Sequence, residues 1–496
     1  MMNVEQYTTE PLFGLDKEFL LKNQLLQILD NSSNYLTFKE IAHHFRGISI
    51  DVLQQTCRKI QSDFLEWYSV EECELVIHPQ LGARLLRKKI PFKALIDAYA
   101  CQELSYTLLQ ELFRYRELIA SDFYENQHVS ESTLRRKIKR INQSLAHYNL
   151  RITFAYKIKL TGSELAIRSF YFYFLFLFYR QLPAVPGIAE QGFFESKAIK
   201  IQNHLGLTLS LKELGVFSLI YYVHEHGVHS GTPLRLTEKE NELFHQFDFP
   251  PKPNFLNNWS FNDWQFFLLF TMATDLFEQD FDIATRDVLV PLFVFESLAW
   301  GQAFKMAFGQ LTSEEQALVH EAIQKSLVLS YFISIDDEFF RLFQVINFEA
   351  FQQQNPLFYQ RFEQFWNDFR FKVPALDSSS FKFTSLMLAS YFSPLDTQLY
   401  SVKIAVYSEV SSHFSYYLAN RLKSQFKTKY DFVFITDFQQ ADLIITTFKL
   451  PAEECYETPQ IIIDPVLTSN DLLLIDQWIE KTIMKESDLL LSMPDI

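Results

Sequence analysis

The sequence predicts a multidomain, mainly α-helical protein. We expect a tandem winged helix-turn-helix at its N-terminal end, then two helical bundles and a small C-terminal α/β domain with a parallel sheet. Three observations predict this order. A basic amphipathic segment and two alternating runs occupy residues 130–159. Long amphipathic segments fill residues 165–394, and only 12 glycines in 496 residues disfavour a turn-rich β architecture. After Lys403, short apolar runs alternate with helical periodicity, which is typical of parallel α/β domains.

We predict that residues 1–88 form the first winged helix-turn-helix. Lys17–Leu29 is amphipathic, Thr37–Glu40 is a capping box that opens a second helix, and Ser49 starts a third helix. A strand is expected at Glu74–His78. Three side chains on the predicted outer face of the third helix are candidates for DNA contact: Gln55, Arg58 and Lys59. A purely structural or dimerising helical domain is the alternative for this unit.

We predict that residues 89–165 form the second winged helix-turn-helix. Helical runs at Tyr106–Phe113 and Ile119–Tyr124 precede a turn and a helix that starts near Ser130. Spacings of four, three and four residues predict one buried face on that last helix. The residues of this face are Leu134, Ile138, Ile141 and Leu145. Two alternating runs after Asn149 predict a hairpin.

The outer face of this helix is strongly cationic. Between Ser130 and Lys159 the chain has eight basic residues and one acid, Glu131. Such a helix can present side chains to base edges in the major groove, while its cations bind phosphate. The predicted DNA contacts are Ser130, Ser132, Thr133, Arg135, Arg136, Lys139, Arg140 and Gln143 on the helix, and Lys157 and Lys159 in the hairpin. Lys137 falls nearer the buried edge. A solvated surface helix without a ligand is the alternative.

Charge is distributed unevenly along the chain. The net charge is −15, yet residues 1–165 hold 21 basic and 20 acidic residues, which leaves 24 and 40 for the remainder. A near-neutral front with a basic helix, joined to an acidic body, fits DNA binding at one end and regulation at the other. No metal-ligand spacing, nucleophile elbow or phosphate-binding glycine loop occurs, so we expect no catalytic activity, cofactor or metal.

Location and membrane contact can also be judged from the sequence. The four cysteines form no C-x-x-C pair, and the N-terminus lacks a basic region followed by an apolar run. A reducing cytoplasm is therefore expected. The aromatic run Ser169–Tyr179 is too short to span a bilayer, so it predicts a buried core helix or a subunit contact.

The remaining chain divides into three predicted domains, at residues 166–285, 286–398 and 399–496. The helices expected in the two bundles are Leu211–His226, Asn262–Phe277, Arg286–Phe308, Ser313–Leu329 and Leu357–Phe371. The elements expected in the last domain are strands at Lys403–Tyr407, Phe432–Ile435, Leu443–Ile445 and Ile461–Ile463, a loop at Ser408–His413, and helices at Phe414–Lys427 and Asn470–Met484.

This order of domains resembles the Mga/AtxA-type regulators of Gram-positive bacteria. The resemblance is carried by the motif Val129–Leu134 with Arg136, Ile138, Ile141, Asn142 and Leu145, and by Thr161–Glu164 with Ile167 and Arg168. It implies a DNA-binding transcriptional regulator, usually an activator of virulence or surface-protein genes. It also implies two domains that are phosphorylated on histidine by the sugar phosphotransferase system (PRD-like domains), and a tail like the IIB component of that system. Double-stranded DNA, a second copy bound through the C-terminal half and a phosphocarrier protein are the implied partners.

Two features bear on the regulatory part of this resemblance. Ser408 stands where IIB domains have their phosphorylated cysteine, and a hydroxyl cannot replace a thiolate. We therefore expect a IIB-like fold that serves as an interaction surface. The candidate phosphoacceptors are His204, His224 and His320, with ordinary structural histidines as the alternative. Two rival functions stay open: a phosphotransferase-system phosphocarrier or IIB-type component, and an RNA-binding antiterminator.

Overall fold

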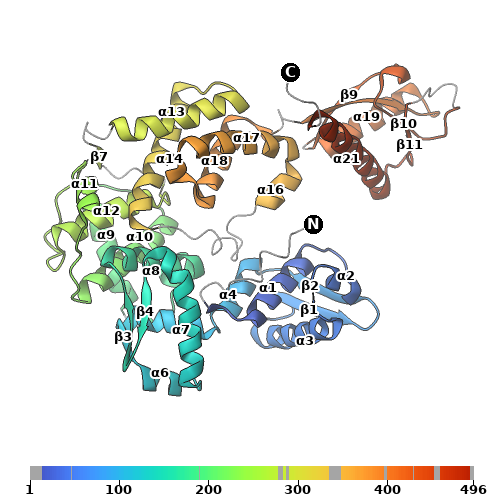
Figure 1. Ribbon diagram of the computed structural model, residues 1–496. Helices are drawn as coiled ribbons and strands as arrows, with labels where there is room; N and C mark the ends of the chain where they lie inside the picture. Colours follow the sequence, from blue (N-terminus) through green and yellow to red (C-terminus); the bar gives the residue numbers. More distant parts are fainter. Residues whose placement is uncertain are drawn as a thin grey trace. The chain divides into compact units, whose positions relative to one another are not determined.

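The structure is a computed structural model that describes residues 14–45, 47–188, 190–277, 283–285, 290–333, 348–395, 399–427, 429–451 and 458–491. It is mainly helical, with small antiparallel sheets near the N-terminus and a parallel sheet near the C-terminus (Figure 1). The chain divides into two compact units. One comprises Met1–Gly301, Thr312–Asn347 and Lys372–Thr384, and the other comprises Gln302–Leu311, Phe348–Phe371 and Ser385–Ile496.

The first N-terminal segment contains the three predicted helices and a hairpin. Its elements are α1 (Lys17–Asp30), α2 (Phe38–His43), α3 (Ile50–Trp67), β1 (Cys73–His78) and β2 (Gly82–Arg87). The capping box of Thr37 and Glu40 is present, and the Ser49 hydroxyl caps α3. The sequence analysis missed β2, which pairs antiparallel with β1. Leu25, Leu53 and Ile60 are fully buried between the helices and this hairpin.

The second N-terminal segment combines helices with a three-stranded sheet. Its elements are α4 (Phe92–Ala100), α5 (Leu104–Tyr115), β3 (Glu117–Ile119), α6 (Ala120–Asn126), α7 (Glu131–Leu145), the short 3-10 helix η3 (Ala146–Tyr148), β4 (Arg151–Phe154) and β5 (Lys157–Thr161). The strand order is β3-β5-β4. The expected helix at Ile119–Tyr124 is partly wrong, because Ile119 pairs with Lys157 and ends a strand. The expected hairpin is therefore part of a three-stranded sheet. Helix α4 also packs on the first segment, where the Tyr99 hydroxyl donates to Asp63.

A helical bundle follows within the same unit. Its elements are α8 (Glu164–Tyr179), η4 (Leu182–Ala184), α9 (Gln191–His204), α10 (Leu211–His229), α11 (Glu238–Phe244), β6 (Phe247–Asp248), α12 (Phe261–Ala273), β7 (Ala284–Thr285) and α14 (Ser313–Phe332). The aromatic run lies in α8 and is largely buried, as expected of a core helix. In the part of the chain that the structure describes, no helix is both long enough and apolar enough to cross a membrane. Helix α12 ends at Ala273, four residues before its predicted end.

The predicted boundary between the two bundles lies at residues 285 and 286, and the structure describes only the first of them. Residues 286–289 lie outside the described residues. Helix α14, expected in the second bundle, packs on α12 of the first, with the Phe332 ring 5.2 Å from that of Phe266. The remaining helices are α13 (Val290–Ala307), α16 (Phe348–Gln354), α17 (Pro356–Lys372), η6 (Pro374–Leu376) and α18 (Ser379–Phe392). In the second unit, Phe304 contacts Phe365 of α17 and Phe392 of α18.

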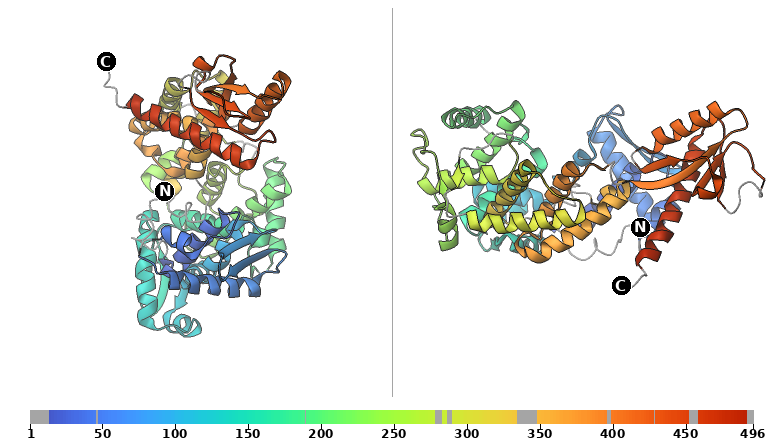
Figure 2. Two further views of the ribbon diagram at one scale, coloured as in Figure 1. Left: turned by 90° about the vertical axis from the view of Figure 1, so that its right-hand side faces the viewer. Right: turned by 90° about the horizontal axis from the view of Figure 1, so that it is seen from above.

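The C-terminal segment is the expected parallel α/β fold. Its elements are β8 (Tyr400–Tyr407), α19 (Ser412–Phe426), β9 (Tyr430–Phe434), η8 (Phe438–Gln440), β10 (Leu443–Thr446), β11 (Gln460–Ile462) and α21 (Ser469–Leu491). All strands are parallel, in the order β11-β10-β8-β9. Leu418 of α19 and Ile475 of α21 share one apolar cluster with the strands, so both helices cover the same face (Figure 2). The loop expected at Ser408–His413 is shorter than predicted, because the Ser411 hydroxyl caps α19.

Candidate nucleic-acid interface

Helix α7 is held from behind by its apolar face. Leu134, Ile141 and Leu145 are fully buried and Ile138 is 4% exposed, as the spacing predicted. The Ser130 hydroxyl accepts from the Thr133 N–H at 3.1 Å, which satisfies one of the unpaired donors at the helix start. Helices α6 and α7, with the turn between them, form a helix-turn-helix in which α7 is the second helix (Figure 1).

Asn142 joins α7 to the sheet, and the sequence analysis did not assign it this role. Its side-chain amide donates to the Ile152 carbonyl at 2.8 Å, and its carbonyl oxygen accepts from the Ile152 N–H at 2.7 Å. These two hydrogen bonds fix strand β4 against the helix. The sequence shows only that this polar residue stands next to Ile141 of the apolar face and belongs to the motif that carries the family resemblance. Asn142 therefore sets the angle between the helix and the hairpin that follows it.

Two cations of α7 face solvent and have no ion pair within the described part of the chain. Arg136 and Lys139 are exposed, and neither makes a salt bridge with any residue that the structure describes. They are three positions apart in the sequence, so they lie about one helical turn apart on the same side of α7. Ser132 and Gln143 are exposed beside them. Arg140 is half exposed, with its guanidinium 3.8 Å from the Asp16 carboxylate.

The other two basic residues of α7 are engaged within the molecule. The Arg135 guanidinium lies 2.7 Å from the Glu131 carboxylate and 4.0 Å from the centre of the Phe154 ring. The Lys137 side chain is only 6% exposed, and its ammonium donates to the Gly14 carbonyl at 2.8 Å. Asp16 and Glu103 surround the same ammonium at 2.8 and 3.3 Å. Lys137 thus ties α7 to the chain before α1 and to the start of α5.

The two lysines of the hairpin share one carboxylate. Glu117 of β3 lies directly opposite Lys159 in the sheet, with Lys157 two positions away on the same strand. Both ammonium groups pair with the Glu117 carboxylate, at 2.5 Å for Lys159. Hydrogen bonds from Lys157 and Lys159 lower the pKa of Glu117 to about 2, so this group stays ionised at neutral pH. Nothing in the sequence pointed to Glu117, because it lies about forty residues before its partners.

Helix α3 presents the predicted polar face of the first segment. Gln55, Arg58 and Lys59 are exposed. The Lys59 ammonium lies 3.2 Å from the Glu18 carboxylate of α1, whereas Arg58 has no salt bridge among the described residues. This face carries less available positive charge than α7. A contact between α3 and DNA stays a prediction.

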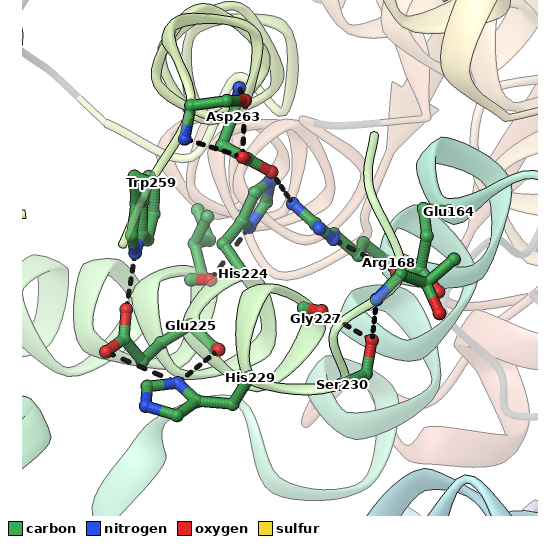
Figure 3. Close-up of polar contacts among 12 residues, drawn as sticks. Glu164, Arg168, His224, Glu225, Gly227, His229, Ser230, Trp259 and Asp263 are labelled. Atoms are coloured by element: carbon green, nitrogen blue, oxygen red, sulfur yellow. Dashed lines mark hydrogen bonds and ion pairs between the residues drawn. The ribbon is translucent and has the colours of Figure 1, made fainter. Parts of the chain in front are cut away.

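His224 is a poor candidate for phosphorylation. It is fully buried, and its Nδ1–H donates to the Ile220 carbonyl at 2.9 Å (Figure 3). Burial lowers its pKa to about 3, with a smaller contribution from the nearby Arg168 charge. A phosphoryl donor cannot reach an imidazole that is closed in by Trp259, Phe266 and Phe267. His224 is therefore the least accessible of the three candidate histidines.

The other regulatory candidates differ in access. His204 is exposed at the end of α9, and its Nε2–H donates to the Pro251 carbonyl at 2.8 Å. His320 is half-buried, with Nδ1 2.9 Å from the Ser297 hydroxyl. Ser408 is 4% exposed and accepts from the Thr447 hydroxyl at 3.0 Å. Cys455 lies outside the described residues. Among the residues that the structure describes, no cluster of side chains could hold a metal ion.

Together these features define the class of protein. A helix-turn-helix whose second helix is buried on one face and cationic on the other belongs to a DNA-binding transcriptional regulator. Residues 88–176 match the family model described as the Mga helix-turn-helix domain. No curated protein matches the chain.

Proposed function

We propose that this regulator binds duplex DNA by placing α7 in the major groove, with both N-terminal segments acting as winged helix-turn-helix units. The observation that carries the proposal is the pair Arg136 and Lys139, one turn apart, exposed and without a salt bridge among the described residues. Exposed cations of this kind release counterions when they bind phosphate. Ser132 and Gln143, which are exposed beside them, can reach base edges.

The remaining predicted contacts have graded roles in this proposal. Ser130, Ser132, Thr133 and Gln143 supply hydrogen-bonding groups along the same face of α7. Arg140 binds phosphate once Asp16 releases it. Arg135 acts mainly by stiffening the contact with Phe154, because its guanidinium already has two partners. Gln55, Arg58 and Lys59 of α3 form a second, less charged contact.

Fluorescence anisotropy with two labelled probes tests the proposal. One probe is the duplex upstream of the gene for this chain, and the other is an RNA stem-loop of the same sequence. We expect the chain to bind the duplex. The logarithm of the association constant should fall linearly with the logarithm of the salt concentration, with a slope of roughly −0.9 per phosphate contact. The RNA should bind at least about tenfold more weakly, because its narrow major groove does not admit a helix. Preference for RNA would instead support the antiterminator alternative, and absence of duplex binding would refute the proposal.

We propose further that residues 166–285 and 286–398 are PRD-like domains, that residues 399–496 are a IIB-like interaction domain, and that the regulator is a cytoplasmic activator which self-associates through its C-terminal half. His204 and His320 are the phosphoacceptors consistent with burial. Incubation with a phosphorylated phosphocarrier protein, followed by mass spectrometry under alkaline conditions, should detect a phosphate that His204→Ala or His320→Ala removes. His147→Ala, at an exposed histidine near the hairpin, is the control. An unmodified parent chain would refute regulation by this route.

A further inference from the structure

Two neighbouring residues at the end of α5 face opposite partners. Arg116 turns toward the helical bundle, and Glu117 turns toward Lys157 and Lys159 of the hairpin. Arg116 has a φ of 62°, in a region that residues other than glycine seldom adopt. Such a backbone conformation persists only when the surrounding structure holds it. The contacts of Arg116 are therefore the place to look for that restraint.

A buried chain of ion pairs holds Arg116. Its two terminal nitrogens each lie 3.4 Å from an oxygen of Glu164, the first residue of α8. The same carboxylate lies 3.3 Å from Nε of Arg168, whose Nη1 donates to Asp263 of α12 at 2.6 Å (Figure 3). The Arg168 side chain is 1% exposed. Two arginines and two carboxylates thus alternate and balance, which is what burial of such charges requires.

Helix α10 is shaped to admit this chain. A Cβ atom on Gly227 would lie 2.1 Å from Nε of Arg168, so no larger residue fits while Arg168 stays paired. The preceding residue, His226, donates from Nε2 to the Phe113 carbonyl of α5 at 2.6 Å. The Phe113 ring also packs on Tyr171 of α8. The helical bundle therefore contacts the last turn of α5 through both a hydrogen bond and aromatic packing.

On the other side, Glu117 pairs with the two lysines of the hairpin. Its carboxylate neutralises Lys157 and Lys159, the two cations that the hairpin could offer to phosphate. The backbone register places Glu117 opposite Lys159, so the pairing requires that β3 stays paired with β5. A phosphate must displace this carboxylate and then remain close to its negative charge. Both effects weaken phosphate binding by the hairpin.

We propose that Glu117 limits the affinity of the hairpin for DNA by holding Lys157 and Lys159, and that the buried Glu164–Arg168–Asp263 chain keeps Glu117 in place through Arg116. This inference rests on the proposed function and deepens it. Glu117 is a positioning residue that acts through the two lysines. The helical bundle is thereby linked to the DNA-binding surface across two adjacent residues.

The first test is Glu117→Gln in the full chain, measured by anisotropy with a random-sequence duplex across a salt series. We expect binding about threefold to tenfold tighter, with a salt dependence steeper by roughly one to two units, because two lysines become available. Glu111→Gln removes the same charge beside Arg114 of α5 and should leave binding nearly unchanged. In a Lys157→Gln/Lys159→Gln background, Glu117→Gln should have a much smaller effect, because only the repulsion between its charge and phosphate is then removed. Equal or weaker binding by Glu117→Gln alone overturns the proposal.

The second test needs no DNA. Gly227→Ala drives Arg168 from its place, and hydrogen–deuterium exchange of Glu117–Ile119 and Lys157–Thr161 should become about tenfold faster. Gly192→Ala, at a helical glycine with open space around it, is the control. Arg116→Gln is a second variant that adds no atoms to the bundle and should have the same effect. Unchanged exchange of both strands in Arg116→Gln overturns the link. If the parent chain does not bind duplex DNA, the proposed function itself is wrong. If the parent chain binds but the Glu117→Gln variant does not bind more tightly, only this inference is wrong.

Discussion

Replacing Arg136 and Lys139 together by alanine should lower duplex affinity about 100-fold or more. Each side chain is expected to supply about 1–3 kcal/mol through phosphate or base contacts. Because both are exposed and have no salt bridge within the described residues, their removal costs the fold little. The salt dependence should also flatten by roughly two units. Anisotropy across a salt series measures both quantities in one experiment.

A matched control separates this effect from loss of net charge. Lys423 and Lys427, four residues apart near the end of α19, are likewise exposed. Lys423→Ala/Lys427→Ala removes the same charge from the C-terminal segment and should bind duplex like the parent chain. Circular dichroism should show unchanged helix content in both double variants. If the Arg136/Lys139 variant binds as tightly as the parent, α7 does not read DNA.

Asp263→Ala should give the largest loss of stability in the first bundle. The change removes the closest partner of Arg168 and the Asp263–Ser260 capping box at the start of α12. Burial raises the pKa of Asp263, but hydrogen bonds from Ser260 and Arg168 outweigh it and leave the pKa lowered, so the group is an anion at neutral pH. Breaking such a buried pair typically costs about 3–5 kcal/mol, because a charge is left without its partner.

Hydrogen exchange of the amides in α8, α10 and α12 is the suitable measurement. It reports local opening, whereas a chain of several domains does not unfold in one two-state step. Glu240→Ala is the control, since Glu240 closes the same kind of capping box on α11 but is only half-buried and holds no buried arginine. That variant should lose only about 1 kcal/mol. Equal losses in the two variants would mean that the buried ion pair contributes nothing beyond its cap.

The spacing of apolar residues predicted correctly those helices that bury only one face. The stripe from Leu134 to Leu145 sets the face of α7 correctly, and capping residues set the starts of α2, α3 and α7. Strand β3 escaped prediction because three residues are too few to show alternation. It forms because β5 supplies its hydrogen-bonding partners.

The burial of individual polar residues could not be predicted from the spacing of apolar residues. Helix α10 is buried on almost all sides, so its hydrophobic pattern shows no preferred face. His224 therefore looked as accessible as His204, although it is enclosed by aromatic rings from α12 and Trp259. Likewise, Arg168 looked like an ordinary charge at the start of an aromatic run. Its partners, Glu164 and Asp263, come together only when α8 and α12 pack.

The amino-acid sequence by itself determined that this protein has a cationic helix with one apolar side, because that pattern is local and repeats every three to four residues. Only the tertiary structure decided which of its cations remain available. Lys137 is neutralised by Asp16 and Glu103, and the hairpin lysines by Glu117, residues distant in the chain. Electrostatic attraction depends on separation in space, so it is set by how the chain folds back on itself.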